Sequence, residues 1–114
     1  MFKKTDAAKL ELISKYISDI ERIIERHGSA GQMLDDYEGE YAVMMCLTQI
    51  AETVNKITDA DILEKIKSPG IISFRNRLIH NYEGRDKTII LSILENNIPE
   101  LKNIISDLIK EINN

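Results

Sequence analysis

The stretch Asp6–His27, DAAKLELISKYISDIERIIERH, decides the fold class of this chain. Its apolar residues recur at spacings of three and four, which places a continuous apolar stripe on one side of a helix. The stripe consists of Leu10, Ile13, Ile17, Ile20 and Ile24. Thr5 or Asp6 can cap the start of this helix, and the run Gly28–Gly31 ends it. His27 lies in the last turn, where a protonated imidazole complements the helix dipole, so we interpret it as structural rather than catalytic.

Helical periodicity continues through the next part of the chain. Residues 34–57 are expected to form a second helix. Its apolar face contains Tyr37, Tyr41, Met44, Leu47, Ile50, Ala51, Val54 and Ile57. We interpret the Tyr and Met members of this face as core residues rather than as contacts to a cofactor. Thr58 and Asp59 can cap a short third helix, with Ile62, Leu63 and Ile66 directed inward.

Two further helical regions are expected. One covers about residues 71–82, after the break at Ser68-Pro69-Gly70 and before Gly84, a plausible left-handed stop. The last begins near residue 85, and Pro99 should kink or split it because proline lacks a backbone donor. No alternation of strand type competes with these patterns.

The predicted fold is therefore all-α, an up-and-down bundle of four or five helices with a kinked C-terminal helix, in a single domain over residues 1–114. With 43% apolar and 30% charged residues, the composition is typical of a soluble globular protein. The single cysteine, Cys46, excludes an internal disulfide and is expected to be a buried thiol. We expect a cytoplasmic protein without a signal peptide or membrane span, because no apolar run is long enough for either.

Charge is distributed unevenly along the chain. The net charge is −4, yet residues 65–87 hold six basic and two acidic side chains. The stretches before and after, 1–64 and 88–114, are net −6 and −2. A local positive potential can recruit an anionic ligand to an acidic protein. A solvated face with scattered lysines accounts for the same count equally well.

The basic stretch contains Arg75-Asn76-Arg77-Leu78-Ile79-His80-Asn81-Tyr82, the densest group of side chains able to bind anions and transfer protons. At about 100° per residue, Asn76 and His80 share one face of a helix. Arg75 and Tyr82, seven residues apart, line up along one edge. Phe74 and Leu78 supply an apolar stripe on the opposite side.

These side chains suit cleavage of an RNA phosphodiester, in which the 2′-hydroxyl loses a proton and the leaving 5′-oxygen gains one. His80 can transfer either proton near neutral pH, and Arg75 can stabilise charge on the non-bridging oxygens. Asn76 can orient the imidazole or contact the ribose, and Tyr82 can stack on a base. This route needs no metal or other cofactor, and the sequence shows no cluster of ligands at metal-binding spacing. Spacing alone leaves open that these residues form an ordinary exposed face.

The pattern Arg75-x-x-x-x-His80-x-Tyr82 resembles the signature of the HEPN superfamily, specifically its HepT-like branch of small all-α proteins. Two other stretches extend the likeness. Gln49–Thr53 resembles a Gly-Glu-Ala-type segment of the family, with Ala51 where Gly is usual, and Leu94–Leu101 resembles its final kinked helix. The resemblance covers roughly residues 8–110.

The resemblance implies a metal-independent endoribonuclease that acts as the toxin of a type VII-like toxin–antitoxin pair. Arg75 and His80 match the family's catalytic pair, and Asn76 matches the polar residue that follows the Arg. Tyr82 matches the tyrosine that a partner nucleotidyltransferase of the MntA type adenylylates to silence the toxin. The family also implies a homodimer, in which two motif helices face one cleft that binds the RNA substrate.

Other residues and functions enter as alternatives. Glu52 is a weaker candidate for orienting Arg75, and a structural role is the stronger interpretation. Arg77 and Asn81 match variable positions of the family and receive no catalytic role. The competing functions are a non-catalytic helical partner or substrate-binding subunit of a nucleotidyltransferase, and a dimeric bundle with a vestigial site.

Overall fold

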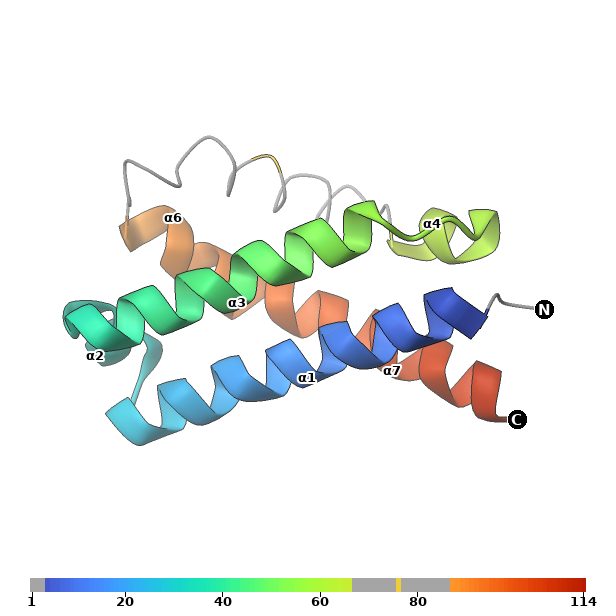
Figure 1. The fold of residues 1–114 in the computed structure, drawn as a ribbon. Helices are drawn as coiled ribbons and strands as arrows, with labels where there is room; N and C mark the ends of the chain where they lie inside the picture. The colour runs from blue at the N-terminus through green and yellow to red at the C-terminus, as the bar shows by residue number, and fades with distance from the viewer. Residues whose placement is uncertain (1–3, 67–75, 77–86) are drawn as a thin grey trace.

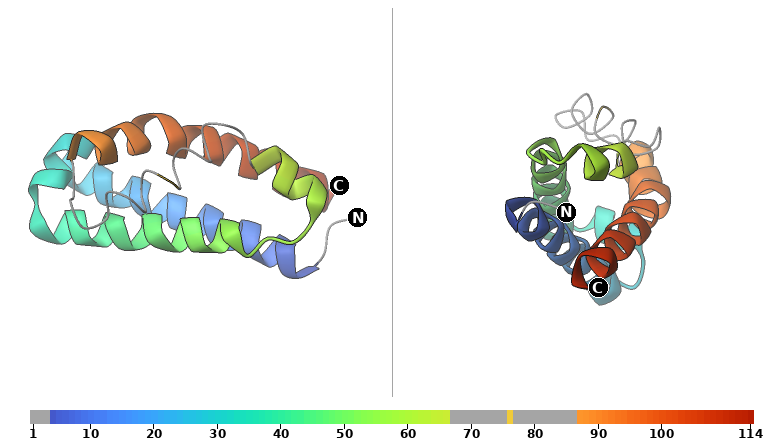
Figure 2. Two further views of the ribbon diagram at one scale, coloured as in Figure 1. Left: turned by 90° about the horizontal axis from the view of Figure 1, so that it is seen from above. Right: turned by 90° about the vertical axis from the view of Figure 1, so that its right-hand side faces the viewer.

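Three long helices form the body of the protein. The computed structural model describes residues 4–66, 76 and 87–114, and no strand occurs among them. Helix α1 (Lys4–His27) runs antiparallel to α3 (Tyr37–Asn55), and α7 (Ile98–Asn113) packs on α1 and also runs antiparallel to it (Figure 1). Seen end-on, α1, α3 and α7 surround a common interior (Figure 2). The predicted all-α, up-and-down architecture is confirmed.

The first helix follows the predicted apolar stripe. Leu10, Ile13, Ile17 and Ile20 are at most 2% exposed, and Ile24 packs half-buried beside them. Gly28 stops the helix in the left-handed conformation, with φ of 95°. The predicted capping role of Thr5 or Asp6 is wrong, because α1 already includes Lys4 and both residues lie inside it.

The second predicted helix is divided at Asp36, so the prediction of one continuous helix from residue 34 is wrong. Helix α2 (Ala30–Asp35) begins at Ser29, whose hydroxyl accepts a hydrogen bond from the Gln32 amide at 3.1 Å. Asp36 has an extended backbone, and its carboxylate caps α3 by accepting from the Gly39 amide at 3.1 Å. Asp36 breaks the helix because its side chain satisfies the first turn of α3 from outside the helical conformation.

Helix α3 presents apolar side chains on two faces. Leu47 and Ile50 are fully buried, as predicted, and so is Val43, which the predicted face did not include; this side of α3 packs on α1. Tyr37 and Tyr41 are wrongly assigned to the core by the sequence, because they are 71% and 44% exposed. Their rings contact each other edge to face, with centroids 4.7 Å apart.

A short helix, α4 (Ala60–Ile66), follows the predicted cap. The Asp59 carboxylate accepts hydrogen bonds from the amides of Asp61 at 2.9 Å and Ile62 at 3.1 Å. Ile62 and Ile66 are fully buried, which confirms the predicted inward face.

The C-terminal helical region is interrupted just before Pro99, as predicted. Helix α6 (Lys87–Ser92) leads into a π-helical turn, η1 (Ile93–Asn97), and then into α7. The Ile98 amide donates to the Ile93 carbonyl five residues earlier, which widens the turn. Pro99 then lies in the first turn of α7, where its missing N–H costs least.

The described residues share one hydrophobic core. Its fully buried large side chains come from α1, α2, α3, α4, η1 and α7: Leu10, Ile13, Ile17, Ile20, Met33, Leu47, Ile50, Ile62, Ile66, Ile93 and Leu101. None of the helices in the described part of the chain is long and apolar enough to cross a membrane.

Candidate functional site

Only one of the predicted site residues belongs to the described part of the chain. Asn76 is helical and exposed, as the polar face of the predicted fourth helix requires. Arg75, His80 and Tyr82 lie outside the described residues, as does the rest of that helix. Their roles therefore remain predictions. The structure describes the helices that precede and follow them.

Both ends of the motif-bearing stretch join firmly packed elements. It follows α4, whose last residue Ile66 is fully buried, and precedes α6, in which Ile90 is 2% exposed. Lys65 pairs with Glu111 of α7 at 3.0 Å. Lys87 pairs with Asp35 of α2 at 3.5 Å. The flanking elements are thus tied to the bundle on both sides of the motif.

A buried carboxylate fixes the connection that leads into α4. Asp6 has no exposed surface and accepts hydrogen bonds from the Asp59 amide at 2.7 Å and from the Thr58 amide and hydroxyl at 3.2 Å. Lys9 lies 3.3 Å from the same carboxylate. Burial alone would raise the pKa of Asp6, but the backbone hydrogen bonds from Asp59 and Thr58 and the contact with Lys9 outweigh it, so the pKa is lowered. This contact was missed from the sequence, because it joins residues more than fifty positions apart.

His27 has a structural environment. Its Nδ1 lies 2.7 Å from the Ile23 carbonyl oxygen, and its Nε2 lies 2.9 Å from Asp36 Oδ2. Both partners are acceptors, so only the doubly protonated ring can donate to both at once. The hydrogen bond to Ile23 raises the pKa of His27, and the Asp36 carboxylate raises it further. The predicted structural role is confirmed, and His27 also orients the residue that caps α3.

Cys46 and Glu52 lie on α3. Cys46 is buried, as predicted, and burial raises the pKa of its thiol, with Asp19 acting in the same direction. A thiol held protonated in this way is a poor nucleophile. Glu52 is exposed, and its suggested contact with Arg75 falls on a residue outside the described ones. Within the described ranges, no three His, Cys, Asp or Glu side chains gather into a potential metal site.

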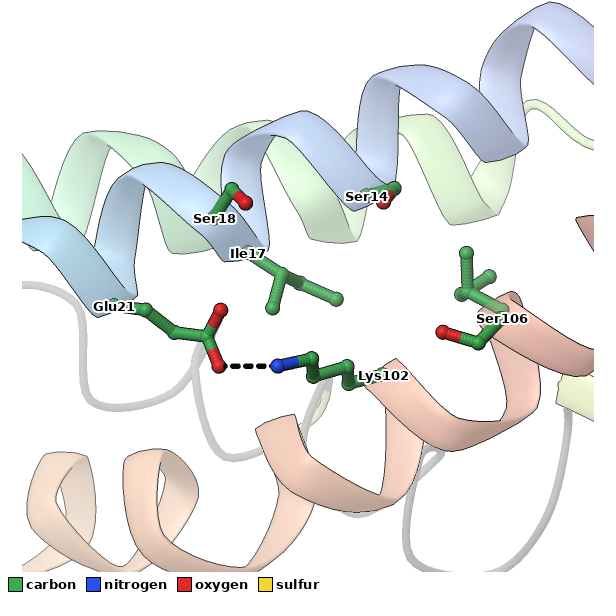
Figure 3. Close-up of a pocket in the computed structure, with 7 residues that line it drawn as sticks. Ser14, Ile17, Ser18, Glu21, Lys102 and Ser106 are labelled. Atoms are coloured by element: carbon green, nitrogen blue, oxygen red, sulfur yellow. Dashed lines mark hydrogen bonds and ion pairs between the residues drawn. The ribbon is translucent and has the colours of Figure 1, made fainter.

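A small polar groove lies between α1 and α7. Ser14 and Ser18 face it from α1, and Ser106 faces it from α7 (Figure 3). Glu21 and Lys102 pair across it at 2.7 Å. The two charges neutralise each other, and the groove contains neither a His nor an Arg, so it lacks the pair of side chains that the predicted cleavage uses.

Comparison with known proteins identifies the class of this fold. The family model described as "Ribonuclease HepT-like" matches residues 13–108, which include the whole motif. The protein "Putative RNase MJ1216" of Methanocaldococcus jannaschii is 32% identical over 115 positions, which cover 98% of this chain and 93% of that protein. A second protein of the same organism, "Putative RNase MJ0125", is 37% identical over 76 positions, or 64% of this chain and 65% of its own length. No solved structure matches at a comparable level.

The chain therefore belongs to the HepT-like ribonuclease family. The family resemblance seen in the sequence is confirmed, and the protein belongs to the class of ribonucleases.

Proposed function

We propose that this protein is a metal-independent endoribonuclease in which Arg75 and His80 cleave RNA. The observation that carries the proposal is the family match, which spans residues 13–108 and so includes the motif residues. Both relatives described above are named as RNases. Asn76 is the residue of the motif that the structure describes, and it is helical and exposed.

In the proposed reaction, the 2′-hydroxyl attacks the adjacent phosphorus and the 5′-oxygen leaves. His80 transfers one of the protons that the exchange requires. Arg75 binds the non-bridging oxygens as their negative charge increases. Asn76 orients His80 from one turn away. The products are a 2′,3′-cyclic phosphate and a 5′-hydroxyl, and the atoms balance without an added water or metal.

The proposal extends to a cellular role. We assign the protein as the toxin of a cytoplasmic toxin–antitoxin pair, folded as one domain over residues 1–114 and acting as a homodimer with its site at the dimer cleft. The antitoxin is an MntA-like nucleotidyltransferase that adenylylates Tyr82. An AMP group on Tyr82, two residues beyond His80, adds bulk and negative charge where the RNA phosphate must bind.

The cleavage reaction is tested by incubating the purified protein with cellular RNA in EDTA. Wild type should cleave it, and His80→Ala should lower the rate by about 10²–10⁴-fold through loss of proton transfer. Arg75→Ala should have a comparable effect through the lost charge stabilisation. Asn81→Ala is the matched control on the adjacent variable position and should retain activity. Equal, intact RNA with wild type and His80→Ala would overturn the proposal and favour the non-catalytic subunit.

The antitoxin assignment is tested separately. Co-expression with an MntA-type nucleotidyltransferase should add one AMP to the mass of the wild type and suppress its RNase activity. Tyr82→Phe should gain no mass and stay active in the same cells. AMP on a different residue, or suppression of Tyr82→Phe by the same enzyme, contradicts the assigned control site.

A further inference from the structure

One fully buried charged side chain has no part in the proposed reaction. Among the described residues, the buried polar side chains are Asp6, Thr53 and Asn97, and of these Asp6 carries a charge. Burying a carboxylate costs free energy unless other groups compensate for the lost water. Both oxygens of the Asp6 carboxylate are engaged, by Lys9 and by donors that lie more than fifty residues along the chain.

The contacts of Asp6 join the start of α1 to the segment that connects α3 with α4. The Asp59 amide donates to Asp6 at 2.7 Å, and the amide and the hydroxyl of Thr58 each donate at 3.2 Å. Lys9 lies 3.3 Å from the same carboxylate and donates to the Lys56 carbonyl oxygen at 2.8 Å. We refer to these contacts of Asp6 and Lys9 with the connecting segment as the Asp6 clasp.

The Asp6 clasp determines where α4 begins. The amide of Asp59 donates to Asp6, while its carboxylate caps α4 by accepting from the amides of Asp61 and Ile62. One residue thus connects α1 to the first turn of α4, and both lie at the same end of the bundle (Figure 1). With seven residues, α4 is too short to be stable by itself, so its position depends on this cap and on packing.

Helix α4 is also the element from which the motif-bearing stretch starts. Its last residue, Ile66, is fully buried, and Lys65 pairs with Glu111 of α7 at 3.0 Å. Arg75 and His80 follow in the next part of the chain. A shift of α4 therefore moves the point at which the motif-bearing stretch is attached. A displacement of about 1 Å caused far from the reacting groups can lower a rate by about 100-fold.

We propose that Asp6 is a positioning residue of the ribonuclease site, which fixes α4 through the Asp6 clasp and so orients the stretch that carries Arg75 and His80. This inference rests on the proposed ribonuclease reaction and adds a residue to it. Because Asp6 has no exposed surface, it does not contact RNA itself. It acts through the backbone of Thr58 and Asp59.

The positioning role depends on the charge of Asp6. Burial opposes ionisation, but the hydrogen bonds from Asp59 and Thr58 and the contact with Lys9 outweigh it and lower the pKa of Asp6. Asp6 is therefore a carboxylate at neutral pH, and hydrogen bonds to an ionised acceptor are about twice as strong as neutral ones. Asp6→Asn keeps the size of the side chain, removes its charge and places a donor NH2 group among the donors of the clasp.

The first test follows backbone hydrogen exchange of the full chain by mass spectrometry. Asp6→Asn should speed exchange about tenfold or more in residues 56–66, the effect of losing a hydrogen bond to a charged group. The same variant should speed exchange in residues 67–86, which contain the motif, and leave that of α3 unchanged. Faster exchange confined to residues 56–66 overturns the proposal, because the Asp6 clasp would then secure its own segment and not the motif.

The second test measures RNA cleavage well below the melting temperature of each variant. Asp6→Asn should lower kcat by about 10–100-fold and change KM little, since the catalytic groups are misplaced but not removed. Thr58→Val, which loses the hydroxyl donor of the Asp6 clasp, should lower kcat less but in the same direction. Thr58→Ser keeps that donor and should match the wild type. The Thr58 pair decides the question if Asp6→Asn does not fold, and equal kcat in Thr58→Val and Thr58→Ser would then contradict the positioning role.

Ile17→Val is the matched control for a general loss of stability. Ile17 is buried in the same helix, and shortening it lowers the melting temperature without touching the Asp6 clasp. It should leave kcat and the exchange of residues 67–86 as in the wild type. If Ile17→Val lowers kcat as much as Asp6→Asn does, Asp6 contributes to stability alone and the proposal is overturned.

Failure of this proposal can be told apart from failure of the proposed function. A wild type that cleaves no RNA sinks the ribonuclease reaction, and Asp6 loses its role in that reaction with it. A wild type whose cleavage depends on His80 but not on Asp6 overturns the positioning role and leaves the ribonuclease reaction standing.

Discussion

Helices α1 and α3 bury similar apolar stripes but have different outer faces. On α1 the outer face carries both signs of charge, and Asp19 pairs with Lys15 at 3.3 Å and with Arg22. On α3 the outer face carries Tyr37, Tyr41 and Met45, among acids alone. A helix face whose opposite charges pair with one another is well suited to contact with water. An apolar, single-sign face is suited to a second surface.

The largest effect on stability is expected when a substitution on the buried side of α3 is compared with one on its exposed side. Leu47 is fully buried on the inner side and Met45 is 62% exposed on the outer side. Leu47→Ala should lower the free energy of unfolding by about 2–5 kcal/mol, because it leaves a cavity in the core. Met45→Ala should change it by less than about 0.5 kcal/mol in dilute monomer.

Urea denaturation followed by circular dichroism measures both variants. Leu12→Ala, on the outer face of α1, serves as a second exposed control. The distinction between the faces fails if Met45→Ala proves as destabilising as Leu47→Ala under conditions where the protein is monomeric.

Periodicity predicted the inner faces well and the outer face of α3 poorly. Ile13 and Ile17 follow the helical spacing and are buried. Tyr37 and Tyr41 follow it too, yet lie outside, because at about 100° per residue Tyr41 points about 180° away from the fully buried Ile50 of the same helix. Spacing defines a face of a helix but not which face meets the core, and that choice depends on packing against other helices.

Polar contacts between residues far apart in the chain could not be predicted from the sequence either. Asp6 was interpreted as a local helix cap, but it accepts hydrogen bonds from Thr58 and Asp59, which follow α3 along the chain. Pro99 was easier to interpret, because its missing donor has a local consequence wherever the helix lies. At the motif, Asn76 alone lies among the described residues, so Arg75, His80 and Tyr82 depend on family membership and on the experiments above.

A smaller effect is expected where α1 and α3 meet through Gly39. A Cβ added there would lie 2.9 Å from the Met33 carbonyl oxygen and 3.1 Å from the His27 ring. Gly39→Ala should therefore lower the free energy of unfolding by about 1–2 kcal/mol, since the clash exceeds the gain in helix propensity.

Gly31 is the matched control for this substitution. It lies in α2, and its added Cβ would meet only Ser29 Oγ at 4.0 Å. Gly31→Ala should stabilise the protein by about 0.5–1 kcal/mol through helix propensity and reduced freedom of the unfolded chain. Thermal melts of the two variants measure the difference, and equal shifts of the same sign would contradict the tight contact at Gly39.

The smallest effect concerns the charge on the His27–Asp36 contact that joins α1 to α3. The pKa of His27 is raised in the folded protein, first by its hydrogen bond to the Ile23 carbonyl and then by Asp36. The pKa of Asp36 is lowered, so its carboxylate stays ionised at neutral pH. The protonated ring therefore stabilises the fold fully below the unfolded pKa of about 6.5. This stabilisation is lost as the pH rises through the higher folded pKa.

Thermal midpoints measured across this range should fall as the pH rises above about 6.5. His27→Gln removes the titrating group, keeps a donor, and should flatten that slope. The comparison with His27→Gln also separates this effect from titration of His80, which both proteins retain. A slope of the same size in His27→Gln, or a wild type that becomes more stable as the pH rises, would mean that the α1–α3 junction does not depend on a protonated His27.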